Sequence, residues 1–370
     1  MNDLKFGVFD HLDRGHRSIS ELYEQRLKLV EHYEKAGFYC YHLAEHHSTP
    51  LGMAPSPSVF LSAVAQRTKT LHFGPMVYLL PLYHPIRLSE EIAMLDQLSH
   101  GRLEVGVGRG RSPIELMLYG TDFKASQAIF DEALSVIQLA YSEERINFEG
   151  THFKFSSVPV ELRPMQQPHP PFWYGVGSPE SADEIAPKGF HAITLAKPAA
   201  AAEIARHYFE GVKRAGLTDR RMGICRFVIV GETDREAKAL AARAYPIWHE
   251  SFFELFRRYN QKPQQTWSGD FSVMEADGLA VAGSPETVAK KLGEQLQMVG
   301  ANYLVSQLVF GDMTLEESTR SIDLFASEVM PVLLGTRPLG KSASTPESQE
   351  KAGLVEERST GGREASCGFL

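Results

Sequence analysis

The sequence predicts an α/β protein folded as a (β/α)8 TIM barrel, and three observations favour this class. Short apolar runs alternate with amphipathic segments of helix length from the first residues onward. The runs have the composition of buried strands, which implies a parallel sheet with right-handed helical crossovers. Eight such runs precede a final helix, which favours closure into a barrel, although a doubly wound open sheet gives the same alternation.

The strand-helix units can be placed in order along the chain. Lys5 to Phe9 is the first predicted strand. Ser18 to Ala36 is the first helix, because Ser18 is a good N-cap, Glu21 follows three residues later and Gly37 ends the helix. The seven further predicted strands are 38–44, 71–79, 103–107, 171–176, 192–195, 224–230 and 303–308. The other predicted helices include 55–67, 86–98, 125–141 and 315–332.

Two segments interrupt this alternation of strands and helices, and we expect them to be insertions at the C-terminal mouth of the barrel. Residues 143–170 are strand-like and rich in proline, which predicts a hairpin over the mouth. Residues 248–279 are polar and aromatic, which suits a mobile lid. Residues 1–335 are expected to form one barrel domain. Residues 336–370 are expected to form a disordered tail, because few apolar residues remain there.

Composition excludes several function classes. The chain has 370 residues, a formal net charge of -8 and a sequence pI near 6.0, so the charge gives no support for a nucleic-acid partner. No run approaches the roughly 18 apolar residues of a membrane span, and the start lacks the pattern of a signal peptide. Three scattered cysteines suit neither a disulfide framework nor a zinc cluster. A cytoplasmic enzyme acting on a small molecule is the expectation.

The first chemical motif follows the second predicted strand. Residues 42–46 match the H-x-x-E-H zinc pattern, but that pattern requires a helix. Along a strand, four residues separate side chains by about 13 Å, so the zinc interpretation is rejected. Instead, Glu45, His46 and His47 fall at the carboxyl end of the strand, where barrel enzymes carry catalytic groups. A solvated loop with two ordinary histidines is the alternative.

Two glycine-containing turns follow later strands. The string Gly106-Val107-Gly108-Arg109-Gly110, with Arg111 after it, suits a flat ring or a phosphate that approaches the backbone closely; a plain tight turn is the alternative. In the turn that begins at Gly177, Ser178 is a good N-cap whose neighbouring N–H groups can form an anion site. Because Ser-Pro-Glu recurs at 284–286, an ordinary helix start is the alternative there.

These signals coincide in a known family. Four stretches carry the likeness: Leu-Ala-Glu-His-His at 43–47, Gly-Pro-Met-Val-Tyr-Leu-Leu-Pro at 74–81 with His-Pro at 84–85, Leu-Asp-Gln-Leu-Ser-His-Gly-Arg at 95–102 continuing to 110, and Tyr-Gly-Thr-Asp at 119–122. From about residue 5 to residue 332, the chain resembles the bacterial luciferase-like flavin monooxygenases. The order and spacing of the stretches are specific for this family, but not for a substrate.

The resemblance implies a barrel that holds FMN, in its reduced form as co-substrate, at the carboxyl mouth. His46 matches the catalytic histidine, with Glu45 and His47 beside it. The other matched positions contact the flavin, and no metal is implied: Met76, Val77, Gly108, Arg109, Gln127, Gly177, Ser178 and Ser181. Gln127 stands where the family has a phosphate-binding arginine, so Arg111 or a backbone donor is expected to compensate. Gly108 replaces a cysteine of luciferase itself. The resemblance also predicts a cis peptide between Met76 and Val77.

The implied activity is that of a two-component monooxygenase. Reduced flavin reacts with O2 to give a C4a-peroxide, and one oxygen enters a small substrate such as an aldehyde or ketone. His46 suits acid-base work near neutral pH. A separate NAD(P)H:flavin reductase is an expected partner, as is a second copy of the chain, because the second and third helices resemble the dimer-forming face of the family. The alternatives are an F420-dependent hydride-transfer enzyme and a non-catalytic flavin-binding barrel.

Overall fold

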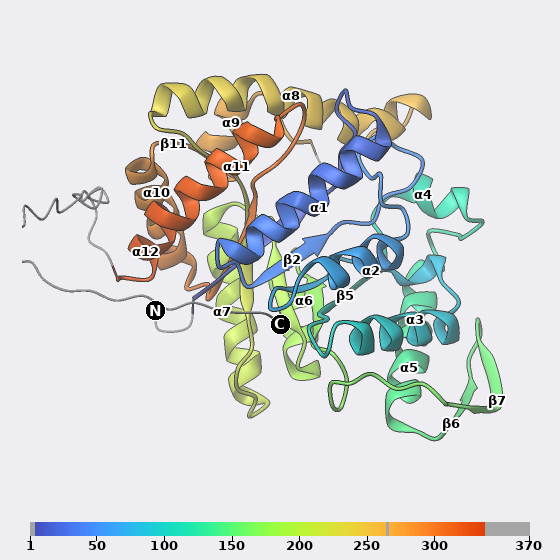
Figure 1. Cartoon of the computed structure of the whole chain (residues 1–370). Helices are drawn as coiled ribbons and strands as arrows, with labels where there is room; N and C mark the ends of the chain where they lie inside the picture. Colours follow the sequence, from blue (N-terminus) through green and yellow to red (C-terminus); the bar gives the residue numbers. More distant parts are fainter. Residues whose placement is uncertain (1–3, 264–265, 337–370) are drawn as a thin grey trace, which may run out of the picture.

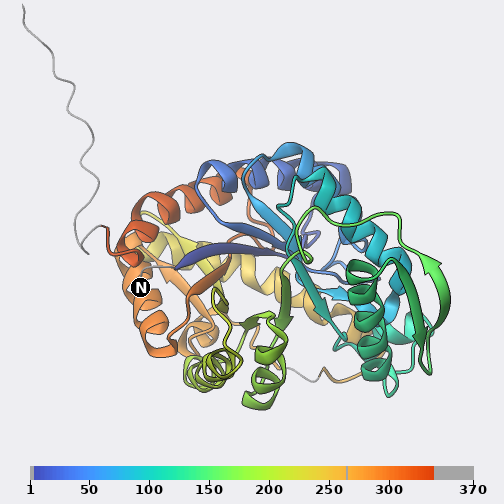
Figure 2. The same cartoon turned by 90° about the horizontal axis from the view of Figure 1, so that it is seen from below.

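The computed structural model describes residues 4–263 and 266–336, and these form a barrel of parallel strands surrounded by helices (Figures 1 and 2). All eight predicted strands are confirmed, within a few residues of their predicted bounds. They are β1 (Lys5–Asp10), β2 (Cys40–Leu43), β3 (His72–Pro75), β5 (Val105–Gly108), β8 (Phe172–Gly175), β9 (His191–Thr194), β10 (Met222–Val230) and β12 (Tyr303–Gln307). The predicted tail from residue 337 onward lies outside the described residues.

The sheet curves round until β3 meets β5. The hydrogen-bonded order is β3-β2-β1-β12-β10-β9-β8-β5, and all these pairs are parallel. Phe73 closes the ring, because its N–H donates to the carbonyl of Arg102 (3.1 Å) and its carbonyl accepts from Glu104 (2.9 Å). Two short strands extend the sheet at its carboxyl edge: β4 (Tyr78–Leu79) beside β5, and β11 (Ala280–Gly283) beside β10.

Glycine makes this closure possible. A Cβ placed on Gly74 would lie 1.5 Å from the carbonyl oxygen of Glu104, and one on Gly106 would lie 2.4 Å from that of Pro75. No larger side chain fits at either position without moving the backbone. The first glycine of the predicted ring-binding turn is therefore also required by the packing of β3 against β5.

Helices form the outer layer of the barrel. They are α1 (Ile19–Lys35), α2 (Pro57–Arg67), α3 (Pro85–Leu98), α5 (Ser126–Ser142), α6 (Pro179–Ile185), α7 (Pro198–Arg214), α10 (Pro285–Val299) and α11 (Leu315–Leu324). Short 3-10 turns span Leu80–Leu82 and Ala186–Lys188. The predicted N-cap of α1 is present, with a capping box in which the backbone N–H of Ser18 donates to the Glu21 carboxylate over 3.3 Å. The predicted last helix continues from α11 through a π-helical turn (Phe325–Val329) into α12 (Met330–Leu333).

Inserted helices lie at the carboxyl mouth. They are α4 (Pro113–Leu118), α8 (Asp234–Arg258) and α9 (Phe271–Ala276). Helix α8 runs across the top of the barrel in Figure 1, and its Ser251 carbonyl accepts a 3.1 Å hydrogen bond from Thr49 in the loop after β2. None of the described helices is both long enough and apolar enough to span a bilayer.

The predicted hairpin forms, but its predicted place over the mouth is wrong. Strands β6 (Arg145–Glu149) and β7 (Lys154–Pro159) pair antiparallel and pack on the outside of α5 (Figure 1). The Glu132 carboxylate of α5 accepts hydrogen bonds from three successive backbone N–H groups at the hairpin turn, those of residues 151–153. This anchor holds the hairpin on the flank of the barrel.

Polar side chains fill the amino end of the barrel interior. The buried Glu104 carboxylate accepts hydrogen bonds from the side chains of Tyr39 and Trp173. Burial opposes its ionisation, but these bonds and the neighbouring histidines lower the pKa of Glu104 to about 2. Because side chains fill this end, the carboxyl mouth is the end of the barrel at which a small-molecule site is expected.

Candidate functional site at the carboxyl mouth

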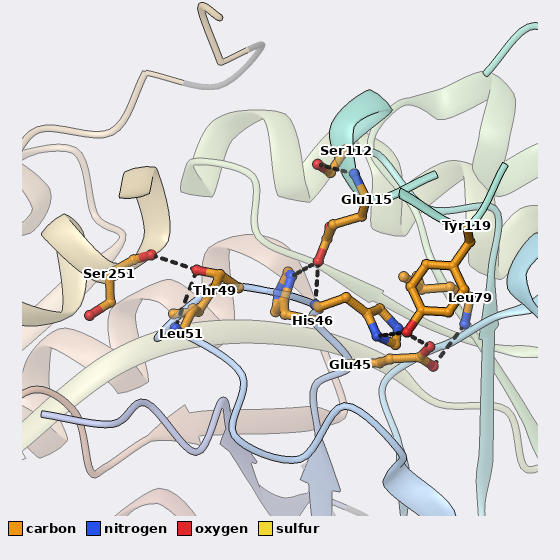
Figure 3. A network of polar contacts seen from close by, with 10 residues as sticks. Glu45, His46, Thr49, Leu51, Leu79, Ser112, Glu115, Tyr119 and Ser251 are labelled. Atoms are coloured by element: carbon orange, nitrogen blue, oxygen red, sulfur yellow. Dashed lines mark hydrogen bonds and ion pairs between the residues drawn. The ribbon is translucent and has the colours of Figure 1, made fainter. Parts of the chain in front are cut away.

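Residues 45–47 lie where the sequence places them, directly after β2 at the mouth (Figure 3). Successive side chains along this loop have different surroundings and contact different partners. His46 is half-buried, with 27% of its side chain exposed, whereas Glu45 and His47 are buried. His42 of the rejected zinc pattern points elsewhere, into the barrel, where its Nε2 lies 2.7 Å from the Tyr303 hydroxyl.

His46 is held by a carboxylate that the sequence analysis missed. Glu115 of α4 places Oε1 at 3.2 Å from Nδ1 of His46, and the same oxygen accepts from the backbone N–H of His47 at 2.8 Å. No side chain among the described residues bonds to Nε2 of His46. Burial opposes protonation of His46, but the carboxylates of Glu115 and Glu45 outweigh it and raise its pKa. The arrangement favours the protonated form of His46 and leaves its Nε2 without a side-chain partner among the described residues.

Glu45 and His47 bond to each other rather than to His46. Nε2 of His47 lies 2.8 Å from Oε1 of Glu45, and Nδ1 lies 2.8 Å from the Tyr119 hydroxyl. The second oxygen of Glu45 accepts from the backbone N–H of Leu79 at 3.1 Å. Burial raises the pKa of the Glu45 carboxyl, and the bonds from His47 and Leu79 oppose that shift. These hydrogen bonds connect the loop that carries His46 to β4 and to Tyr119, the residue after α4.

Several residues that the resemblance matches to the flavin lie at or after the carboxyl ends of β3, β5 and β8. The peptide between Met76 and Val77 is cis, as the resemblance predicts. Val77 lies against the backbone of Gly108, where an added Cβ would come within 2.5 Å of it. Across the mouth, Ser178 and Ser181 form the capping box of α6, and the Ser181 hydroxyl accepts from the N–H of Gly177 at 3.2 Å.

Two arginines reach this region without a carboxylate partner among the described residues. Arg109 lies over the Phe123 ring, 5.1 Å from its centre. Burial and the charge of Glu184 raise the pKa of the Tyr174 phenol, and the positive charge of Arg109 opposes this shift. A Cβ on Gly177 would lie 4.0 Å from Nη1 of Arg111. Arg111 therefore reaches the turn that holds Ser178.

Gln127 makes its side-chain hydrogen bond within its own helix, α5. Its amide donates to Asp131 on the same helix over 3.1 Å, and the side chain is exposed. Arg111 is therefore near the turn before α6, while the Gln127 amide is engaged by Asp131, and the compensation by Arg111 stays a prediction.

Glu115→Gln is expected to lower the pKa of His46, because the substitution removes the neighbouring negative charge. In the wild-type chain the folded-state pKa of His46 lies above the ordinary histidine value of about 6.5. The pairing of His46 with Glu115 therefore stabilises the fold fully below a pH of about 6.5, and this stabilisation is lost as the pH rises through the folded-state pKa of His46. We therefore expect Glu115→Gln to cost on the order of 1 kcal/mol of unfolding free energy at acidic pH and less at alkaline pH. Urea unfolding across pH measures this. Glu161→Gln, an exposed loop change, is the control, and an equal loss at all pH values would contradict the pairing.

Comparisons with known proteins agree with this fold. Residues 4–303 match the family described as luciferase-like monooxygenase. An uncharacterised protein, y4wF of Sinorhizobium fredii, is 40% identical over 88% of this chain and 96% of its own length. The solved structure of the monooxygenase RslO1 from Streptomyces bottropensis superposes with a TM-score of 0.82 at 26% identity, covering 89% of this chain and 99% of that one.

Two more distant solved structures share the fold and differ in cofactor. The oxygenating component of 3,6-diketocamphane monooxygenase from Pseudomonas putida, a type II Baeyer-Villiger enzyme in complex with FMN, has a TM-score of 0.76 at 22% identity, over 89% of this chain and 98% of that one. The coenzyme F420-dependent tetrahydromethanopterin reductase of Methanopyrus kandleri has a TM-score of 0.67 at 20% identity, over 89% and 99%.

Proposed function

Because this chain belongs to the luciferase-like monooxygenase family, we propose that it is an FMN-dependent monooxygenase that inserts one oxygen atom from O2 into a small organic substrate such as an aldehyde or ketone. The observation that carries the proposal is His46, which a buried carboxylate holds at Nδ1 and which presents Nε2 at the mouth of the barrel. Such a group can give or accept a proton beside a bound reactant.

The residues at the mouth fit FMN. Arg109 and Arg111 supply positive charge that no described carboxylate neutralises, which suits a phosphate dianion. Ser178 and Ser181 add hydroxyl groups at the same turn. The cis peptide at residues 76–77 and Gly108, against which Val77 packs, would form the part of the site that faces the flat ring. Reduced flavin, when bound there, would supply the electrons that activate O2.

The chain's own residues would do three things in the reaction. Glu115 fixes the ring of His46 and keeps its Nδ1 proton in place, so that proton transfer occurs at Nε2. The bonded set of Glu45, His47 and Tyr119 holds the His46 loop at its position. Helix α8 runs across the top of the barrel (Figure 1) and would keep water from the reacting groups there.

We expect reduced FMN to be supplied by a separate NAD(P)H:flavin reductase. The chain should bind reduced FMN more tightly than oxidised FMN and should be nearly colourless when isolated. Oxygen consumption should require FMN, NADH and an added generic flavin reductase together. Steady NADH oxidation by this chain and FMN alone would contradict the two-component scheme. Substrate turnover with F420 in the absence of O2 would instead establish the hydride-transfer alternative, whose fold this chain shares.

We also propose that the chain forms a homodimer through α2 and α3. These adjacent helices expose Val59 (73%), Met94 (52%) and Leu98 (47%), side chains that normally avoid water. Met94→Glu is expected to convert a dimer to a monomer in analytical ultracentrifugation, because it buries a charge in the interface. Met298→Glu on α10, also an exposed methionine (61%), is the matched control and should leave the mass unchanged. A monomeric wild-type chain would refute the proposal.

A further inference from the structure

His11 follows the end of β1 directly and has no role in the function proposed above. Its side chain is buried, with 5% of the residue exposed. Its imidazole is nearly parallel to that of His46: the ring centres are 5.5 Å apart and the planes differ by 20°. His46 is thus held by Glu115 at Nδ1 and by His11 on its ring face.

The position of His11 is fixed from three elements. Phe9 of β1 packs edge-to-face on it at 4.7 Å, and Trp248 of α8 does so at 5.4 Å. The turn after β1 is braced from α1, because the buried Arg26 lies 3.2 Å from both the Asp10 and the Asp13 carboxylates. Asp13 also accepts a 2.6 Å bond from the N–H of residue 311. A side chain enclosed in this way cannot swing away from its neighbour.

The charges around the two rings favour a proton on only one of them. The charged groups that influence the pair are Glu115 from α4, Glu45 from the loop after β2 and Arg26 from α1. Burial, then the positive charges of His46 and Arg26, hold the pKa of His11 well below its ordinary range. His11 is therefore neutral when His46 is protonated. A neutral aromatic face within about 6 Å attracts a cation.

We propose that His11 is a positioning residue whose ring face holds the imidazole of His46 in plane, so that Nε2 keeps a fixed direction towards the substrate. The role rests on the proposed function, in which His46 moves a proton. It requires a flat, uncharged ring at position 11 and not a hydrogen bond from it. Phenylalanine should therefore replace His11, whereas leucine, which is apolar but has no aromatic face, should not.

The test is an NMR pH titration of histidine-labelled full-length chain without flavin or substrate. His46→Asn and His11→Phe identify the two signals, and circular dichroism confirms that each variant is folded. We expect His11→Phe to leave the pKa of His46 unchanged or slightly higher. His11→Leu should lower it by about half a pKa unit. Glu115→Gln should lower it too and serves as the positive control. An unchanged pKa in His11→Leu, or a His11 signal that titrates near neutral pH, would overturn the inference.

Turnover separates this inference from the proposed function. With reductase, FMN and substrate, His11→Leu should lower kcat and the yield of product per NADH several-fold, with KM little changed, while His11→Phe stays close to wild type. If the pKa of His46 shifts as expected but product yield is unaffected in both His11→Leu and His46→Ala, the contact between the two rings stands and the acid-base role of His46 is wrong. If His46→Ala loses product but His11→Leu does not, the positioning role of His11 alone is wrong.

Discussion

His46→Ala is expected to lower the yield of oxygenated product per NADH by on the order of 100-fold or more, which is the usual contribution of a general acid-base group. Oxygen should still be consumed, because the substitution leaves Arg109 and Arg111 in place to hold FMN. The reducing equivalents should then leave as hydrogen peroxide. Product by mass spectrometry and peroxide by a coupled assay, both per NADH consumed, measure this uncoupling.

His152→Ala is the matched control for His46→Ala. His152 is exposed on the β6–β7 hairpin, and it is held there through its backbone N–H, which alanine retains. The control should keep wild-type coupling. If His46→Ala keeps it as well, the proton-transfer role of His46 is refuted. A shared loss in both variants would point to a general effect on the fold.

The second large effect is expected for the double substitution of Arg109 and Arg111 by glutamine. Hydrogen bonds to a charged group contribute about 1.5–3 kcal/mol each, and a tenfold change in Kd corresponds to about 1.4 kcal/mol. We therefore expect the Kd for reduced FMN, measured by anaerobic calorimetry, to rise on the order of 100-fold. The larger share should come from Arg109, because Arg111 is more exposed to solvent.

Two controls locate the phosphate site. Arg206→Gln, on the exposed face of α7 and paired with Glu210, should not change the affinity. Gln127→Ala should not change it either, because the amide bonds to Asp131 and not towards Gly177. If Gln127→Ala weakens FMN as much as Arg111→Gln does, the assignment of Arg111 as the compensating group is wrong.

The barrel could be predicted from the sequence because its signals are local. Each strand is a short apolar run, and each predicted helix carries its own start or stop, as Ser18 and Gly37 do for α1. The hairpin was predicted as a hairpin for the same reason. Its place was missed because that depends on Glu132, which lies on a different element and is an ordinary exposed carboxylate by sequence.

The same distinction applies to the candidate site: residues with a local signal could be predicted, and residues that the fold brings in from distant elements could not. His46 could be found because three adjacent polar residues interrupt an apolar strand at its carboxyl end. Glu115 and His11 were missed, because each comes to His46 only through the closure of the barrel, from 69 residues away in the case of Glu115. Their one signal in the sequence is position: His11 follows β1 directly, and Glu115 lies in the short helix after β5, so both stand beyond strands that end at the mouth. A search of such positions for titratable side chains would have found them.

Labelling with ¹⁸O2 tests the central claim most directly. The complete system of chain, FMN, NADH and flavin reductase is incubated under ¹⁸O2 with a panel of aldehydes and ketones, and products are analysed by mass spectrometry. The account predicts a product that carries one ¹⁸O atom, that is absent without FMN or reductase, and that falls about 100-fold with His46→Ala. A product without ¹⁸O, or one formed equally well without O2, would contradict it.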